Sequence, residues 1–147
     1  MLYPVVMTDR ITPERRSWNM SRIKGKDTLP ERIVRSLLHR MGYRFRLHAK
    51  TLPGKPDIAM PKHRLVVEIR GCYWHRHRGC SNCTTPSTRK GFWKSKFRAT
   101  VGRDSRNARA LKELGWRVVI VWECETKDSA ILAKRLKCEL TRACRLA

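Results

Sequence analysis

Carboxylates that could hold a divalent metal ion occur on two neighbouring segments of this basic chain. Asp57 follows Pro56 at the start of one predicted strand, and Glu68 lies on the next predicted strand. If these strands pair, the alternation of side chains places Asp57, Glu68 and Arg70 on one face, while Ile69 points away. Two carboxylates that converge in this way can bind a hard cation such as Mg²⁺. The alternative is a simple ion pair between Glu68 and Arg70 on an edge strand.

The order of these residues resembles the PD-(D/E)xK pattern of metal-dependent nucleases. Arg70 stands where that pattern usually has a lysine. Because a guanidinium stays protonated, Arg70 cannot act as a general base. We therefore predict an electrostatic role for Arg70, in which it stabilises the charge that develops on a phosphate during cleavage.

A second group of side chains has the composition of a structural zinc site. Such a site needs four tetrahedral ligands, usually thiolates with some imidazole. Cysteines and histidines are concentrated in the polar segment 71–86, and a further cysteine follows an apolar strand near residue 123. The predicted ligands are Cys72, His77, Cys80 and Cys124. Cys83 is the main substitute for one of them, and a set of free buried cysteines is the alternative.

The charge of the chain indicates a polyanionic partner. Lys and Arg number 34 against 12 Asp and Glu, so the formal net charge is +22. Such an excess costs self-repulsion in a compact fold, which favours nucleic acid, and double-stranded DNA in particular. A ribosomal or chromatin protein would have a similar charge. A membrane is less favoured, because no apolar run approaches the roughly 18–20 residues of a spanning helix.

The chain length and the amino terminus lead to expectations about organisation and location. No secretory leader is recognisable, so we expect a cytoplasmic, reducing environment in which the cysteines are ligands or thiols rather than disulfides. The 147 residues suffice for one domain with its own core. We expect a flexible arm at residues 1–11, a single domain at residues 12–147, and a monomer.

Hydrophobic periodicity and capping signals predict an α/β fold in which helices flank a mixed central β-sheet. The predicted helices are a short one opening at residue 12, then 28–41, 87–115 and 127–144, and the predicted strands are 43–47, 56–60, 64–70 and 116–123. The last strand is the most apolar and is expected to be central. Helix 87–115 is expected to break near Gly102, with Asp104 as the cap of its second piece. In the last helix the residues expected to face inward are Ile131, Leu132, Leu136 and Leu140.

Several short motifs, in order along residues 15–124, resemble those of one family. The most specific is Gly71-Cys72-Tyr73-Trp74-His75 directly after a Val-rich strand, which is similar to the GCFWH signature of the very-short-patch-repair (Vsr) endonucleases. The other matching segments are 16–20, 27–31, 52–57, 92–93, 103–104 and 114–124. Agreement of this many independent motifs makes chance an inadequate explanation.

The resemblance implies a zinc-bearing, restriction-endonuclease-like fold that nicks DNA beside a T:G mismatch with Mg²⁺. It implies that Asp57 and the carbonyl of Ile69 bind the catalytic metal, that His75 acts on water or phosphate, and that two acids support the site. These acids are Glu31 and Asp104. The residues implied to wedge into the base stack are Met20, Tyr73, Trp74 and Trp93, and the cysteines and histidine predicted above match the zinc positions.

Alternative interpretations exist for several of these residues. His75 could be a zinc ligand, Glu31 only the acid of a capping box with Thr28, and Tyr73 and Trp74 core residues. In addition, the basic run that contains Lys94 and Lys96 is expected to contact phosphates, although it could be a solvated helix face.

Members of the family usually carry an apolar residue at position 68 and His or Asp at position 70, so Glu68 and Arg70 are departures. They leave open a Vsr-like restriction or homing endonuclease that needs no mismatch. A noncatalytic, zinc-stabilised DNA-binding module is the alternative from another class.

Overall fold

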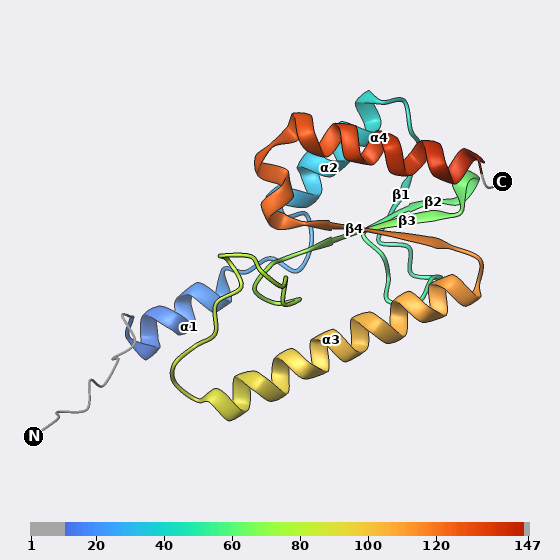
Figure 1. Cartoon of the computed structure of the whole chain (residues 1–147). Coiled ribbons are helices and arrows are strands. Elements are labelled where there is room, and N and C mark those ends of the chain that lie inside the picture. Colours follow the sequence, from blue (N-terminus) through green and yellow to red (C-terminus); the bar gives the residue numbers. More distant parts are fainter. Residues whose placement is uncertain (1–10, 146–147) are drawn as a thin grey trace, which may run out of the picture.

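The computed structural model describes residues 11–145, with side chains described up to residue 142, and it has three layers. Figure 1 shows helices α2 (Leu29–Arg40) and α4 (Ser129–Arg145) on one face of a β-sheet and helix α3 (Lys90–Glu113) on the other. Helix α1 (Pro13–Ser21) extends away from these layers. The expected arm lies almost entirely outside the described residues. The α/β architecture predicted from the sequence is confirmed.

The sheet has the strand order β1-β2-β3-β4. Its strands are β1 (Arg46–Leu47), β2 (Ile58–Met60), β3 (Leu65–Arg70) and β4 (Arg117–Trp122). The first three strands pair antiparallel in chain order and so form a β-meander, with a short 3₁₀ turn (Pro61–His63) between β2 and β3. Strand β4 returns parallel to β3 through the α3 crossover, so the sheet is mixed.

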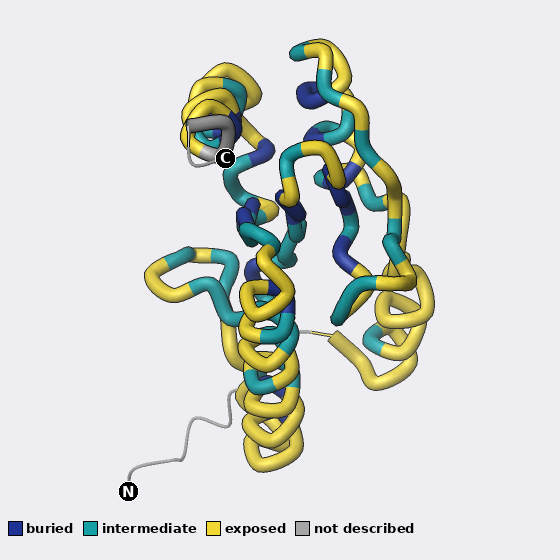
Figure 2. The backbone as a smooth tube through the Cα atoms, turned by 90° about the vertical axis from the view of Figure 1, so that its right-hand side faces the viewer, coloured by how far each residue is buried: buried dark blue, intermediate teal, exposed yellow. Residues whose placement is uncertain are grey.

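Alternating residues of the sheet build a core on each face. Leu65 and Val67 pack with residues of α2 and α4, whereas Val66 packs with Leu111 of α3. The same alternation carries Ile69 to the α2/α4 side and leaves Glu68 and Arg70 on the α3 side. Figure 2 shows the buried backbone concentrated in this central layer, with the exposed faces of the helices outward.

Helix α2 starts where the capping signal predicted. The side chain of Thr28 accepts the N–H of Glu31 at 3.5 Å, and Pro30 occupies the first turn, where its missing N–H costs nothing. The helix ends at Met41, after which Gly42 adopts a positive φ of 85°. The predicted helix over residues 28–41 is therefore confirmed almost to the residue.

Three sequence-based expectations about the elements are wrong. Strand β4 lies at an edge of the described sheet, not at its centre. It is apolar because helices cover both of its faces, and an apolar composition does not distinguish such an edge strand from a central one. Helix α3 runs unbroken through Gly102, so Asp104 lies in its interior and caps nothing. An interior glycine costs only about 1 kcal/mol, which a helix of this length tolerates.

The third correction concerns α4. Leu132, Leu136 and Leu140 are buried as expected, but Ile131 is 67% exposed because it lies in the first turn, beside the capping residue Asp128. Within the described residues, no helix is long and apolar enough to cross a membrane.

This difference between neighbours on α4 gives a direct test of the core. Leu132→Ala should lower the free energy of unfolding by about 2–5 kcal/mol, because it leaves a cavity under the sheet. Ile131→Ala should change it by no more than about 0.5–1 kcal/mol. Urea unfolding followed by circular dichroism measures both values, and equal losses would show that α4 is oriented differently.

Candidate functional site

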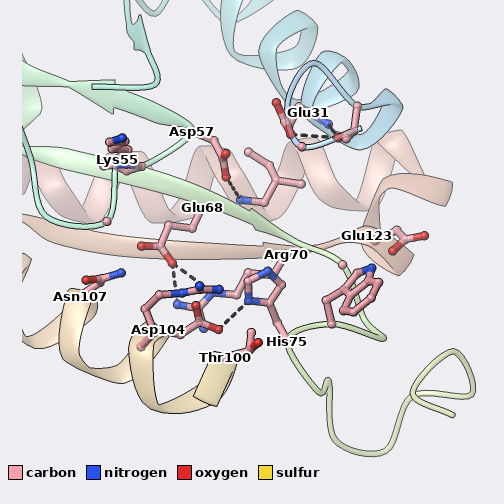
Figure 3. A pocket seen from close by; sticks show the side chains of 18 of the residues that line it. Glu31, Lys55, Asp57, Glu68, Arg70, His75, Thr100, Asp104, Asn107 and Glu123 are labelled. Atoms are coloured by element: carbon pink, nitrogen blue, oxygen red, sulfur yellow. Dashed lines mark hydrogen bonds and ion pairs between the residues drawn. The ribbon is translucent and has the colours of Figure 1, made fainter. Parts of the chain in front are cut away.

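Asp57 lies where strands β2 and β3 separate. The last pair of the two strands is Ile58 with Val67, and just beyond it the Asp57 carboxylate turns in and accepts the N–H of Ile69 at 2.8 Å. Burial raises the pKa of Asp57 to about 6, although this hydrogen bond partly opposes the shift. Figure 3 shows Asp57 between Glu31 and Glu68, and the negative charges of both acids add to the rise. A carboxylate in these surroundings is favoured when a cation is present.

Glu68 and Arg70 form an ion pair on the α3 face of the sheet. Nε and Nη2 of Arg70 donate to the same carboxylate oxygen of Glu68, at 3.0 and 2.5 Å. Their side chains are only 14% and 12% exposed. The pairing that the sequence offered as an alternative is thus present. It uses Oε2 of Glu68 and orients the guanidinium of Arg70 beside the pocket.

His75 is oriented by an acid from the long helix. Its Nδ1 lies 2.6 Å from Oδ2 of Asp104, in the middle of α3, and both side chains are largely buried. A carboxylate on Nδ1 fixes the ring and leaves Nε2 for another partner. Asp104 therefore contacts a candidate catalytic histidine, and His75 is not part of the Cys/His cluster.

Glu31 makes hydrogen bonds at the start of helix α2 and also lines the pocket. Its Oε1 accepts from the Thr28 hydroxyl at 3.1 Å and its Oε2 from the N–H of Asp27 at 3.0 Å, so it closes the start of α2. The residue is also buried, at 5% exposure, and lines the same pocket as Asp57. A helix cap thus brings a carboxylate to the site.

These groups surround one open pocket with a volume of about 1170 Å³. The pocket also contains residues that the sequence analysis did not select, among them Lys55 and Asn107. Gly54 has a positive φ of 73°, and a Cβ atom there would lie 2.6 Å from the Asn107 amide nitrogen. This close approach holds the loop before Asp57 against α3. Its signal in the sequence was the Pro-Gly turn, but the partner on α3 had none.

The Cys/His cluster brings together the four predicted ligands. One ligand atom each from Cys72, His77, Cys80 and Cys124 lies within 4.8 Å of all the others, and Cys83 is outside the group. The Nδ1 atom of His77 lies 3.6 Å from the Cys72 sulfur and 3.5 Å from the Cys124 sulfur. A tetrahedral zinc site with Zn–S of about 2.3 Å and Zn–N of about 2.0–2.1 Å requires a sulfur–nitrogen separation of about 3.6 Å. The donor atoms and their spacing therefore fit zinc.

The cluster fastens the long loop to the end of the sheet. Cys124 lies in the turn η2 (Glu123–Lys127) directly after β4, whereas the other three ligands come from the loop after β3. The His77 ring also stacks on Trp122, with centroids 4.2 Å apart. Burial raises the pKa of the Cys72 thiol to about 12, so a bound cation would be needed to stabilise its thiolate.

Aromatic side chains form a continuous group beside the pocket. Tyr73 makes edge contacts with Trp74, Trp93 and Phe97, with centroid distances from 5.1 to 6.0 Å. Trp93 is only 7% exposed and lies against Phe97, so it supports the group from beneath. Phe97 was missed, although its position one helical turn after Trp93 was a usable signal, and the 47% exposed Phe92, part of the matching segment 92–93, also contacts Trp93.

The remaining residues predicted to contact DNA are more dispersed. The Lys96 ammonium lies 5.3 Å from the centre of the Trp74 ring and so belongs to the aromatic group, whereas Lys94 is exposed on α3. Met20 is 38% exposed on α1.

The sequence and the fold are similar to those of known DNA endonucleases. Residues 8–83 match the family described as "DNA mismatch endonuclease Vsr". The chain is 50% identical over 131 residues to the type II nicking enzyme V.XorIIP of Xanthomonas oryzae pv. oryzae, covering 89% of this chain and 96% of that one. It is 45% identical over 109 residues to the DNA mismatch endonuclease Vsr of Escherichia coli, covering 74% and 69%. The catalytic domain of the homing endonuclease I-Bth0305I has a TM-score of 0.56 at 20% identity, covering 80% and 98%, and shares the fold.

The Cys/His cluster is testable through metal content and stability. Purified protein should contain about one Zn²⁺ per chain, as a four-ligand site requires. Cys124→Ser should lose the metal and unfold at a lower temperature, because structural zinc contributes directly to folding. Cys83→Ser is the matched control and should keep both values. Full metal content in a Cys72→Ser, Cys124→Ser double variant, measured by elemental analysis, would exclude this ligand set.

Proposed function

The chain belongs to the Vsr family of DNA mismatch endonucleases, and on that premise we propose that it nicks double-stranded DNA next to a T:G mismatch with Mg²⁺. The observation that carries the proposal is the arrangement of Asp57 and the His75–Asp104 pair around one pocket. An oxygen-rich metal position beside an oriented imidazole is what hydrolysis of a phosphodiester requires. Relatives named nicking enzymes or mismatch endonucleases support the single-strand cut.

The donor set suits a hard cation. Asp57, Oε1 of Glu68 and the carbonyl of Ile69 would supply oxygen ligands, which Mg²⁺ prefers. Bound there, the ion would polarise the phosphodiester and lower the pKa of a coordinated water. Among the described residues the Asp57 carboxylate accepts one hydrogen bond, from the backbone amide of Ile69, so it has no side-chain partner to give up when it binds a metal.

In this proposal two side chains act on the reacting groups, and two acids position or support the site. Nε2 of His75 moves a proton to or from the attacking water, while Asp104 holds the ring through Nδ1. Arg70, oriented by Glu68, stabilises the charge that develops on the phosphate. Glu31 supports the metal side of the pocket through its hydrogen bonds.

The aromatic group is the proposed means of finding a mismatch. A T:G wobble costs less to unstack than a Watson–Crick pair, so a wedge discriminates between them by deformation energy. Tyr73 and Trp74 are the candidate wedges, Trp93 supports them, and Met20 approaches from α1. Nonspecific attraction comes from the net charge of +22 and from lysines such as Lys94.

The metal role of Asp57 is tested by an isosteric change. Asp57→Asn keeps an oxygen that can accept the Ile69 N–H but removes the charge, so cleavage should fall by about a thousandfold, or about 4 kcal/mol. DNA binding should be largely preserved. The exposed Glu113→Gln on α3 is the control and should cut normally in the same nicking assay. An Asp57→Asn enzyme that cuts at the wild-type rate would remove Asp57 from the mechanism.

Glu68→Ala is assayed separately with the same duplex. A loss of cleavage is expected if the Glu68 carboxylate contributes both a metal ligand and the anchor of Arg70. A silent Glu68→Ala would leave Asp57 and the Ile69 carbonyl as the metal ligands and contradict both roles of Glu68.

Mismatch recognition is tested at Trp74. Trp74→Ala should slow cleavage of a T:G duplex by one to two orders of magnitude, roughly 1.4–2.8 kcal/mol. Binding to any duplex at low salt should barely change. Lys94→Ala should do the reverse and reduce the salt dependence of binding for matched and mismatched duplexes alike. Wild-type enzyme that cuts both duplexes equally would instead support a Vsr-like restriction or homing endonuclease.

A further inference from the structure

A second acidic group adjoins the catalytic pocket and encloses an arginine. The guanidinium of Arg35 on α2 donates to Oδ1 of Asp27 at 2.7 Å and to Oε2 of Glu31 at 3.0 Å. Its Nη2 also lies 3.2 Å from Nε2 of His48. None of these contacts involves the Cys/His cluster or the hydrogen bond between Asp57 and Ile69.

The three partners of Arg35 could themselves bind a metal ion. One ligand atom each from Asp27, Glu31 and His48 lies within 4.8 Å of the other two. The guanidinium contacts a polar atom of all three, so it occupies the place that a cation would take. Two carboxylates and an imidazole are a usable donor set for a divalent ion such as Mn²⁺. Arg35 therefore competes directly with metal at this position.

The surroundings of Arg35 make it a fixed charge rather than a mobile surface group. Its side chain is 16% exposed, and that of Glu31 is 6% exposed. The Nε atom of Arg35 is buried and has no hydrogen-bond partner among the described residues. A buried guanidinium with an unsatisfied N–H is held in place by the charges around it. The hydrogen bond from Arg35 also lowers the pKa of the Asp27 carboxyl.

His48 connects this charge to the catalytic strand. Because a guanidinium can only donate, Nε2 of His48 is the acceptor in this contact. The backbone N–H of His48 donates to the carbonyl of Asp57 at 3.1 Å. His48 has a positive φ of 47°, and its ring contacts Arg35 of α2. A continuous path of contacts thus joins Arg35 to both Glu31 and Asp57.

We propose that Arg35 is a positioning residue that acts as a built-in cation: it holds Glu31 at the pocket and keeps divalent metal out of the Asp27–Glu31–His48 group, so that metal is directed to Asp57. The direction of metal to Asp57 rests on the proposed metal-dependent cleavage; the exclusion of metal from the second group does not. Removing the guanidinium opens a site that the wild-type protein keeps closed.

The test counts Mn²⁺ ions bound to zinc-loaded protein by electron paramagnetic resonance, alongside single-turnover cleavage. Arg35→Met should bind one more Mn²⁺ ion per chain than wild type, and its maximal cleavage rate should fall by about tenfold to a hundredfold because Glu31 is no longer held. Arg35→Lys keeps a cation and should bind the wild-type number of ions with a smaller loss of rate. Arg32→Met, an exposed arginine on the same helix, should match wild type in both measurements.

A double variant locates the new ion. Asp27→Asn added to Arg35→Met removes one ligand and should return the ion count to that of wild type. An Arg35→Met protein with the wild-type ion count, or an extra ion that survives in the double variant, would overturn the proposal. If Arg35→Met does not fold, Arg35→Gln, which keeps polar contacts without the charge, is judged by the same count. Wild-type protein that fails to cut any duplex would count against the proposed function, while the difference in ion number would still decide this inference.

Discussion

The hydrogen bond from the Ile69 amide to the Asp57 carboxylate forms at the point where β2 ends and β3 continues. Beyond this point β3 is supported only by β4, which pairs with Glu68, Ile69 and Arg70 in turn. The carboxylate accepts the amide hydrogen of Ile69 that a neighbouring strand would otherwise accept, and it does so beside the pocket. The same arrangement frees the edge of β3, where an extra ligand can approach Asp57. If β2 continued beside β3, the Ile69 N–H would pair with a backbone carbonyl instead of the Asp57 carboxylate.

Local signals in the sequence were sufficient for much of this architecture. The capping signal at Thr28 and Glu31 correctly predicted the start of α2, because a cap depends on residues one turn apart. Strand alternation correctly placed Glu68 and Arg70 on one face, because the side-chain period of a strand is independent of its partners. The cysteine and histidine spacing identified the four members of the Cys/His cluster, since few other roles explain so many sulfur and imidazole groups in a polar loop.

Contacts between distant segments were not predictable in the same way. The position of β4 at the edge of the sheet depends on which strands pair. Its apolar composition indicates only that both of its faces are covered. The partner of Asp104 was taken to be its own helix, whereas the structure gives it His75 from the loop. Arg35 and His48 carry no motif at all, because their relation follows from the packing of α2 against the segment after β1. Only the resemblance to a family could supply the catalytic grouping before the fold was known.

The distribution of charge explains how such a basic protein can hold acids at a site for DNA. A carboxylate facing a polyanion is repulsive unless a cation compensates it. Two acids of the pocket have such partners, Glu68 with Arg70 and Glu31 with Arg35, while Asp104 contacts the His75 ring. Among the described residues, Asp57 has a backbone amide as its hydrogen-bond donor and no ion pair. The compensated acids can position other groups without repelling phosphate, whereas the charge of Asp57 is left for the proposed metal. A cation bound there would neutralise the Asp57 carboxylate and attract the scissile phosphate to the same point, so that metal binding and substrate binding favour each other.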